Sequence, residues 1–136
     1  MNDFYKINVT ALENSLNSLK IAQEEYLKEK NEFVRDSVIQ RFEYTYALAV
    51  KFIQRYIELN IPNQDDINSF TFNQLIRQAN EMGILKNNLE NWIIYRQMRN
   101  ITSHTYDEEK AEQVLSIMED FIQEIDFLIG KIKWFI

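Results

Sequence analysis

Only two glycines and one proline interrupt this chain of 136 residues, and that scarcity of helix breakers constrains the fold more than any other feature. Leu, Ile, Glu, Lys, Gln and Asn dominate the remaining positions, so long helices are strongly favoured over strands. The composition therefore predicts an all-α protein. With 46% apolar residues, the chain is expected to form a single domain over residues 1–136.

Apolar spacing and capping motifs predict an antiparallel up-and-down bundle of four main helices plus one short helix. Three segments match the capping box, in which two side chains three residues apart satisfy backbone N–H groups: Thr10–Glu13, Thr71–Gln74 and Thr105–Glu108. Pro62 forbids continuation of the second helix, and Gly83 is placed to end the short one. The predicted helices cover residues 10–30, 33–59, 71–83, a segment that opens at 87–90, and 105–133.

The absence of cysteine excludes disulfides, thiol nucleophiles and cysteine-ligated zinc or iron–sulfur sites. Such a chain suits a reducing cytosol. Residues 1–6 do not resemble the start of a secretory leader, and no window approaches about 18 uninterrupted apolar residues. We expect a soluble, cytoplasmic protein that does not associate with membranes.

The net charge of −6 argues against broad, non-specific coating of nucleic acid, which depends on many phosphate contacts from Lys and Arg. A local basic cleft remains compatible with this charge, because carboxylates concentrate toward both ends of the chain. The cations of the middle stretch are Arg77, Lys86, Arg96 and Arg99. Any nucleic-acid site is therefore expected in the middle.

The only histidine lies in the segment Arg99-Asn100-Ile101-Thr102-Ser103-His104-Thr105-Tyr106. Arginine supplies a permanent cation whose planar donors suit phosphate, and histidine exchanges protons near neutral pH. Together they indicate phosphodiester chemistry. A metal site is not expected, because His104 and Glu108 provide at most two ligands.

Helical geometry predicts how this segment is oriented. At about 100° per residue, Arg99 falls on a face that points away from the core. That face holds Trp92, Arg96, Arg99 and Ser103, and the opposite face holds Ile94, Met98 and Ile101. On a continuous helix His104 would lie about 140° from Arg99, so the two meet only across a chain break or between two copies. The Thr105–Glu108 box supplies such a break, and its helix N-terminus would offer an anion site beside His104.

Aromatic residues of the second helix could either pack or stack on bases. At helical spacing we favour core and dimer packing for them, whereas Trp92 is less settled because it shares the Arg99 face. The series comprises Phe42, Tyr44, Tyr46, Phe52 and Tyr56.

Two segments are distinctive enough to suggest a family. They are Arg99-Asn100-x3-His104-x-Tyr106 and the second-helix stretch RDSVIQRFEYTY at residues 35–46. With the helix order and chain length, they resemble the HEPN family, specifically its branch of nucleotidyltransferase substrate-binding proteins, over nearly the whole chain. One departure is Ala47, where an acidic residue is expected in such relatives.

The resemblance implies a homodimer whose two Arg-x4-His segments face each other across a cleft and cleave RNA without a metal or other cofactor. Arg99 would stabilise charge on phosphorus, His104 would exchange protons and Asn100 could orient the scissile group. Arg96 and Ser103 are expected to bind substrate.

The resemblance also implies a neighbouring small nucleotidyltransferase that acts as an antitoxin by adenylylating the tyrosine of the motif, here Tyr106. A second functional class stays open. The chain could be a non-catalytic helical subunit that binds nucleotide or presents a substrate to that transferase.

Overall fold

The computed structural model describes residues 7–61 and 68–133, and the regular elements in these ranges are helices. They are α1 (Thr10–Lys28), α2 (Glu32–Asn60), α4 (Phe72–Glu81), α5 (Leu89–Ile101), the 3₁₀ turn η2 (Thr102–His104), α6 (Glu108–Leu115) and α7 (Met118–Ile132). The all-α bundle is confirmed. Pro62, predicted to stop the second helix, lies outside the described residues. No helix in the described ranges is both long and apolar enough to cross a bilayer.

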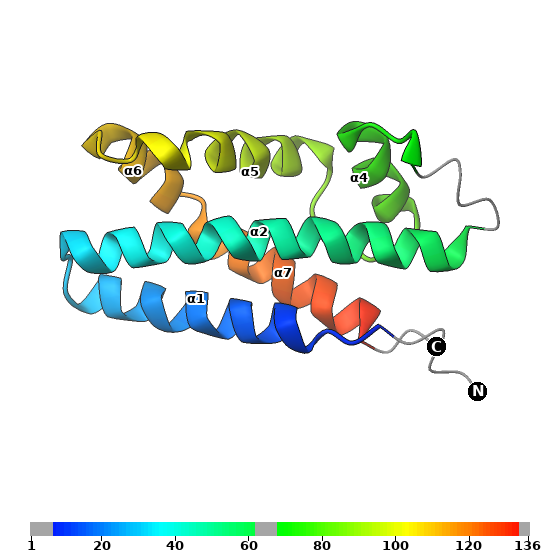
Figure 1. Ribbon diagram of the computed structural model, residues 1–136, viewed down its shortest axis with the longest axis horizontal. Helices are drawn as coiled ribbons and strands as arrows, with labels where there is room; N and C mark the ends of the chain where they lie inside the picture. Colours follow the sequence, from blue (N-terminus) through cyan, green and yellow to red (C-terminus); the bar gives the residue numbers. More distant parts are fainter. Residues whose placement is uncertain (1–6, 62–67, 134–136) are drawn as a thin grey trace.

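The long helix α2 runs through the middle of the molecule and organises the others (Figure 1). α1 lies antiparallel to it on one side, α7 crosses obliquely on that side, and α4, α5 and α6 lie on the other. α5 also runs antiparallel to α2. One core cluster joins the helices, with fully buried apolar side chains that include Leu12, Leu19, Phe42, Ile53, Trp92 and Phe121.

The start of α1 differs from its predicted cap. Val9 occupies the N-cap position and provides no side-chain hydrogen bond, so the capping box predicted at Thr10–Glu13 is wrong. Asn8 satisfies a backbone donor instead, because its Oδ1 accepts from the Thr10 N–H at 3.0 Å. A helix start can therefore be satisfied by a side chain other than that of the predicted N-cap residue, here the amide of a residue that precedes it.

The turns around α4 and α5 follow the predicted chemistry. Thr71 Oγ1 accepts from the Gln74 N–H at 3.2 Å and Gln74 Oε1 accepts from the Thr71 N–H at 2.8 Å, which completes a capping box. Gly83 follows α4 with a φ of 79°, a left-handed conformation that favours glycine. Asn88 caps α5 by accepting from the Asn91 N–H at 3.3 Å.

The last predicted helix is not continuous. It breaks at Ser116 and Ile117 into α6 and α7, although neither glycine nor proline is present there. The Ser116 hydroxyl donates to the Gln113 carbonyl at 2.6 Å, and the Ile117 N–H bonds to the Val114 carbonyl three residues back at 3.3 Å. Such tightened and side-chain-mediated bonds bend helices. The bend keeps both Val114 and Met118 fully buried.

α5 is rotated relative to the prediction. Trp92, assigned to the outward face, is fully buried, whereas Ile94 is 42% exposed and Met98 and Ile101 are only partly buried. The buried indole N–H has an acceptor, because it donates to Glu124 Oε2 at 2.8 Å. A satisfied indole can be buried completely, and it contributes more apolar area than an isoleucine.

Glu124 is a fully buried carboxylate on α7. Besides the indole, Oε1 accepts from the Lys86 N–H at 2.8 Å and Oε2 from the Asn87 N–H at 2.9 Å. Burial raises the pKa of Glu124, and these N–H bonds oppose that rise. Through these hydrogen bonds the carboxylate connects α7 both to the turn that precedes α5 and to the beginning of α5.

Glu124→Gln is expected to lower the free energy of unfolding by about 1–3 kcal/mol, because one of the three N–H donors then faces an amide NH₂ instead of an acceptor. Urea unfolding measures this change. Glu119→Gln, an exposed substitution on the same helix, is the matched control and should stay within about 0.5 kcal/mol of the unaltered protein. Equal losses in the two variants would contradict the anchoring role.

Comparing the unaltered protein with Glu124→Gln at different pH values also reports the titration of Glu124. With a pKa raised in the folded state, the folded protein binds this proton more tightly than the unfolded chain. The stability of the unaltered protein should therefore fall, relative to Glu124→Gln, as the pH rises from the unfolded pKa of about 4.3 through the raised pKa.

Candidate functional site

The segment that contains the only histidine lies at one end of the bundle, where α5 passes through η2 toward α6 (Figure 1). α5 ends at Ile101, so the break predicted between Arg99 and His104 is present. Two hydroxyl groups hold the turn. Thr102 Oγ1 donates to the Arg99 carbonyl at 2.8 Å, and Thr105 Oγ1 donates to the Thr102 carbonyl at 3.0 Å.

Arg99 does not point away from the bundle, in contrast to the prediction. It belongs to the stripe that α5 presents to the bundle, together with the buried Trp92, Tyr95 and Thr102. Its side chain is 42% exposed, and Nη1 lies 3.7 Å from Glu43 Oε2 on α2. The guanidinium therefore lies at the seam between α2 and α5, half in contact with protein and half open to a ligand.

His104 and Tyr106 are exposed neighbours on the turn. Their ring centroids are 6.3 Å apart at an interplanar angle of 73°, and Tyr106 is 85% exposed. Asn100 and Ser103 are also exposed, and in the described part of the chain neither side chain hydrogen-bonds to Arg99 or His104. The turn thus presents its polar side chains to solvent, where a substrate or a second protein could reach them.

The N-terminus of α6 does not provide the predicted anion site. Asp107, rather than Thr105, is the N-cap, and its Oδ1 accepts from the Glu109 N–H at 2.9 Å and the Lys110 N–H at 3.4 Å. The capping box predicted at Thr105–Glu108 is therefore wrong. A carboxylate caps better than a distant hydroxyl here, and Glu108 adds a further negative charge in the first turn.

A polar hollow of about 420 Å³ adjoins Tyr106 on the α2 side. Three carboxylates and one guanidinium line it, so its electrostatic character is acidic and it does not suit a free phosphate. The lining residues are Glu32, Arg35, Asp36, Thr105, Tyr106 and Glu108.

The cations of the middle stretch do not form one cluster. Arg96 lies with its guanidinium carbon 4.9 Å from the Phe72 ring centroid, and both Arg96 and Arg99 act electrostatically on Tyr46. Lys86 instead donates to Gln123 Oε1 on α7 at 3.2 Å. The basic part of the candidate site therefore consists of the two arginines of α5.

Two residues of α2 belong to the candidate site although the sequence alone indicated no part for them in its chemistry. Glu43 pairs with Arg99, and Tyr46 follows one turn later with its ring centroid 6.3 Å from that of Trp92. Ala47, which stands where an acidic side chain was expected, is exposed. Glu43 lies within the stretch 35–46, and antiparallel pairing of the second and fourth helices would have placed it opposite Arg99.

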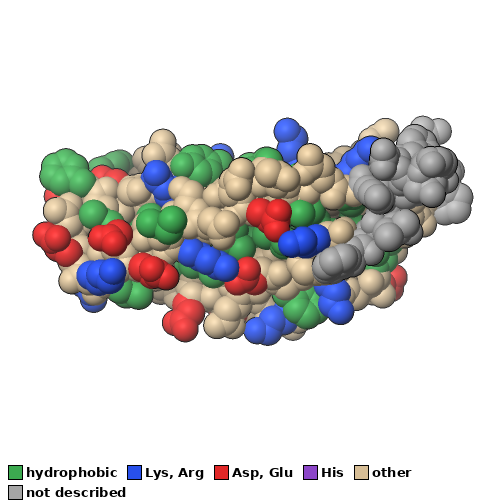
Figure 2. All heavy atoms as spheres, turned by 90° about the horizontal axis from the view of Figure 1, so that it is seen from below, with side chains coloured by type: hydrophobic (Ala, Val, Ile, Leu, Met, Phe, Trp, Pro, Cys, Tyr) green, Lys and Arg blue, Asp and Glu red, His purple; other side chains and the backbone are tan. Residues whose placement is uncertain are grey.

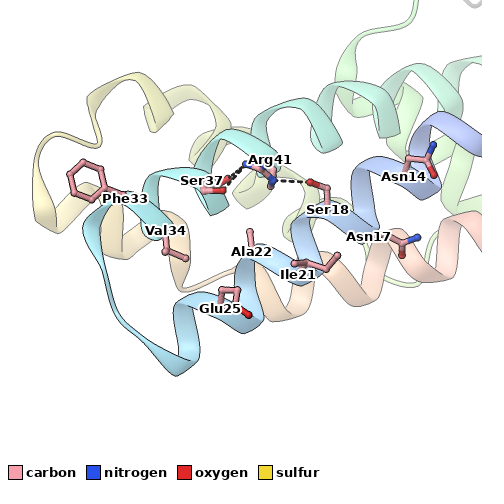
Figure 3. Close-up of a pocket in the computed structure, with 10 residues that line it drawn as sticks. All are labelled: Asn14, Asn17, Ser18, Ile21, Ala22, Glu25, Phe33, Val34, Ser37 and Arg41. Atoms are coloured by element: carbon pink, nitrogen blue, oxygen red, sulfur yellow. Dashed lines mark hydrogen bonds between the residues drawn. The ribbon is translucent and has the colours of Figure 1, made fainter.

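A larger cavity, of about 590 Å³, lies away from this segment, between α1 and α2 (Figure 3). Arg41 is one of the residues that line it, and its side chain is held in place because Nε donates to Ser18 at 2.7 Å and Nη1 to Ser37 at 2.6 Å. Figure 2, which views the molecule from the α1 side, shows basic and acidic side chains intermixed and no histidine. This face therefore carries neither a basic patch nor the histidine chemistry.

Residues 7–133 match the family described as "Nucleotidyltransferase substrate binding protein like". The chain belongs to this family. A curated relative from Haemophilus influenzae, named "Probable ribonuclease HepT", is 34% identical over 137 residues, which span 94% of this chain and 93% of the relative.

Solved structures agree with this family membership. A Haemophilus influenzae protein, described as revealing the fold of a substrate-binding domain of a nucleotidyltransferase, superposes with a TM-score of 0.85 at 32% identity. That match covers 93% of this chain and 99% of the other. A protein from Thermus thermophilus superposes with a TM-score of 0.72 at 26% identity, covering 90% and 98% of the two chains.

Among the described residues of this family member, no three His, Cys, Asp or Glu side chains lie close enough together to hold a metal ion. The seam carries two guanidinium groups, the Glu43 carboxylate and the Tyr46 phenol, and the turn adds the imidazole of His104 and the phenol of Tyr106. These groups suit binding of a phosphodiester and proton transfer to or from its oxygens.

Asp107→Ala should lower the free energy of unfolding by about 0.5–2 kcal/mol, because two backbone N–H groups of α6 lose their acceptor. Thermal or urea unfolding checks this value. Asp107→Asn is the matched control and should remain close to the unaltered protein, since Asn caps helices as well as Asp. A loss of the same size in both variants would point to the charge of Asp107 rather than to capping.

Proposed function

We propose that this family member is a HEPN-type toxin, an endoribonuclease that acts as a homodimer through Arg99 and His104 and needs no metal. The proposal is supported most directly by the position of the Arg99 guanidinium, half-exposed at the end of α5, only a 3₁₀ turn away from the exposed imidazole of His104. The name of the Haemophilus influenzae relative supports the same reaction class.

The reaction follows from the groups available. The 2′-oxygen of RNA attacks the adjacent phosphorus, the bond to the 5′-oxygen breaks, and a 2′,3′-cyclic phosphate and a 5′-hydroxyl form. One imidazole accepts the 2′-hydroxyl proton, and a protonated imidazole donates to the leaving 5′-oxygen. Arg99 stabilises the additional negative charge on the phosphoryl oxygens, and Asn100 orients the scissile group. Arg96 and Ser103 hold the neighbouring backbone.

The homodimer supplies the second imidazole. Each chain has one histidine, whereas the reaction uses a base and an acid at the same time. A two-fold dimer that brings the exposed turns of two copies together places two His104 side chains and two Arg99 side chains at one cleft.

Modification of Tyr106 regulates the activity of the proposed toxin. A cognate minimal nucleotidyltransferase acts as the antitoxin: the Tyr106 oxygen attacks the α-phosphorus of ATP, pyrophosphate leaves and the phenolic proton is released. The 85% exposure of Tyr106 gives a modifying enzyme access. The attached adenylate places a bulky anion beside the His104 ring, whose centroid lies 6.3 Å from that of Tyr106, and it excludes RNA by sterics and by charge repulsion.

A second candidate function is a non-catalytic subunit that binds nucleotide or presents a substrate to that nucleotidyltransferase. The specific observation in its favour is the description of the Haemophilus influenzae structure as a nucleotidyltransferase substrate-binding domain. The two candidates differ in one measurable property, which is RNA cleavage by the isolated protein.

Arg99→Ala and His104→Ala should each reduce RNA cleavage by at least about 10²-fold, because each removes a group that acts on the reacting phosphate or its protons. Cleavage of a fluorescent RNA in the presence of EDTA measures this, and sedimentation of the same samples checks the dimer. Arg77→Ala, which removes an exposed cation on α4, is the matched control and should retain activity. Undiminished cleavage in either site variant would move the active site elsewhere, and no cleavage by the unaltered protein would favour the binding subunit.

Incubation with the cognate nucleotidyltransferase and ATP should add an adenylate group to Tyr106 and stop cleavage, because the adduct blocks the turn that carries His104. Intact-protein mass spectrometry followed by peptide mapping measures this. Tyr44→Phe, which changes an exposed tyrosine on α2, should still accept the adduct, and Tyr106→Phe should not. Inhibition without any change in mass would instead indicate neutralisation by binding alone.

A further inference from the structure

Tyr46 lies where the α2–α5 seam brings two cations together. Because the two helices run antiparallel and Glu43 pairs with Arg99, the next turn of α2 lies opposite the preceding turn of α5, which carries Arg96. The ring contact between Tyr46 and Trp92, at 6.3 Å, agrees with this register. Both arginines act electrostatically on the Tyr46 hydroxyl.

The Tyr46 hydroxyl is an unused donor. The residue is only 8% exposed, and buried tyrosine hydroxyls normally find a hydrogen-bond partner. In the two described ranges the Tyr46 oxygen has no such partner, and it is not one of the polar atoms sealed from solvent without one. The hydroxyl therefore reaches the surface at the seam, beside Arg96 and Arg99.

The chemistry of this position selects an anion with several acceptor oxygens. Burial raises the pKa of Tyr46 to about 12 despite the opposing effect of Arg96 and Arg99, so the hydroxyl keeps its proton and can donate it to an acceptor. Arg96 and Arg99 both act electrostatically on it, and Glu43, the carboxylate nearby, is already paired with Arg99. A phosphodiester supplies acceptor oxygens that two cations and a neutral donor can share.

We propose that Tyr46 is a phosphate-binding residue of the RNA site, whose hydroxyl donates to a non-bridging oxygen of a phosphodiester held between Arg99 and Arg96. This assignment rests on the proposed ribonuclease function and extends it, because it directs the RNA backbone from the η2 turn along the α2–α5 seam. The phosphate bound by Tyr46 neighbours the one that is cleaved. The aromatic ring itself remains part of the core, against Phe42 and Trp92.

Tyr46→Phe is a clean test, because it removes the hydroxyl and leaves the ring contacts in place. Tyr44→Phe is the matched control, since Tyr44 is 42% exposed and lies two residues away on α2, on a different face. Fluorescence anisotropy with a short 2′-O-methyl RNA, which cannot be cleaved, gives Kd, and cleavage of the corresponding RNA gives kcat and KM.

We expect Tyr46→Phe to raise Kd and KM about tenfold, the effect of losing one hydrogen bond to a charged acceptor, while kcat changes little. The thermal midpoint should stay at that of the unaltered protein. The salt dependence of binding should also stay unchanged, because the hydroxyl is neutral, whereas Arg96→Ala should reduce the slope by about one phosphate contact. A purely structural role for Tyr46 would not give this combination.

Two outcomes separate the inference from the proposed function. If the unaltered protein cleaves RNA and Tyr46→Phe behaves like Tyr44→Phe, the assignment of Tyr46 is overturned and the ribonuclease stands. If the unaltered protein does not cleave RNA, the ribonuclease proposal fails, and the anisotropy comparison alone tests the assignment of Tyr46. Weaker RNA binding by Tyr46→Phe than by Tyr44→Phe then supports the phosphate site. Equal binding by the two variants, or no binding by any of the proteins, overturns it.

Discussion

The arrangement of the candidate site depends on the hydrogen bonds that the buried carboxylate of Glu124 accepts. The carboxylate accepts from two consecutive backbone N–H groups before α5 and from the indole of Trp92, so it fixes both the position and the rotation of α5 relative to α7. That rotation turns the stripe containing Trp92, Tyr95 and Arg99 toward the bundle. A buried charge is costly unless its hydrogen-bonding capacity is used, and here three donors use it.

With α5 held in this rotation, Arg96 and Arg99 lie one turn apart on a chain of net charge −6. Arg99 at the seam is partly neutralised by Glu43, and an ion pair exposed to this degree contributes little to stability. Its effect is on position: the contact with Glu43 holds the guanidinium along α2 and so orients it. The hollow beside Tyr106 at the adjoining turn is lined by three carboxylates and one guanidinium, so its electrostatic character is opposite to that of the two arginines of α5.

Local sequence signals predicted much of the fold and part of the site. The cap at Thr71, the helix start at 87–90 and the helix end at Gly83 involve residues within a few positions of one another, and those predictions are confirmed. The orientation of α5 was not predictable from periodicity, because the acceptor that allows Trp92 to be buried lies 32 residues away. Asp107 is the N-cap of α6 in place of Thr105, because the chain offers two candidate caps two residues apart and only the folded geometry decides between them. The segment carrying Arg99 and His104 was recognisable, whereas Glu43 and Tyr46 join it only through helix pairing.

The 3₁₀ turn between α5 and α6 has a dynamic consequence. Threonine hydroxyls that donate to the Arg99 and Thr102 carbonyls help to hold it, and of its residues only Thr102 is buried. Segments with so few buried contacts open locally at a small fraction of the free energy needed to unfold the core. Amide protons of this turn would therefore exchange with solvent long before those of α2. Local opening of this kind takes microseconds to seconds and would move the imidazole of His104 while α5, which carries Arg99, stays folded.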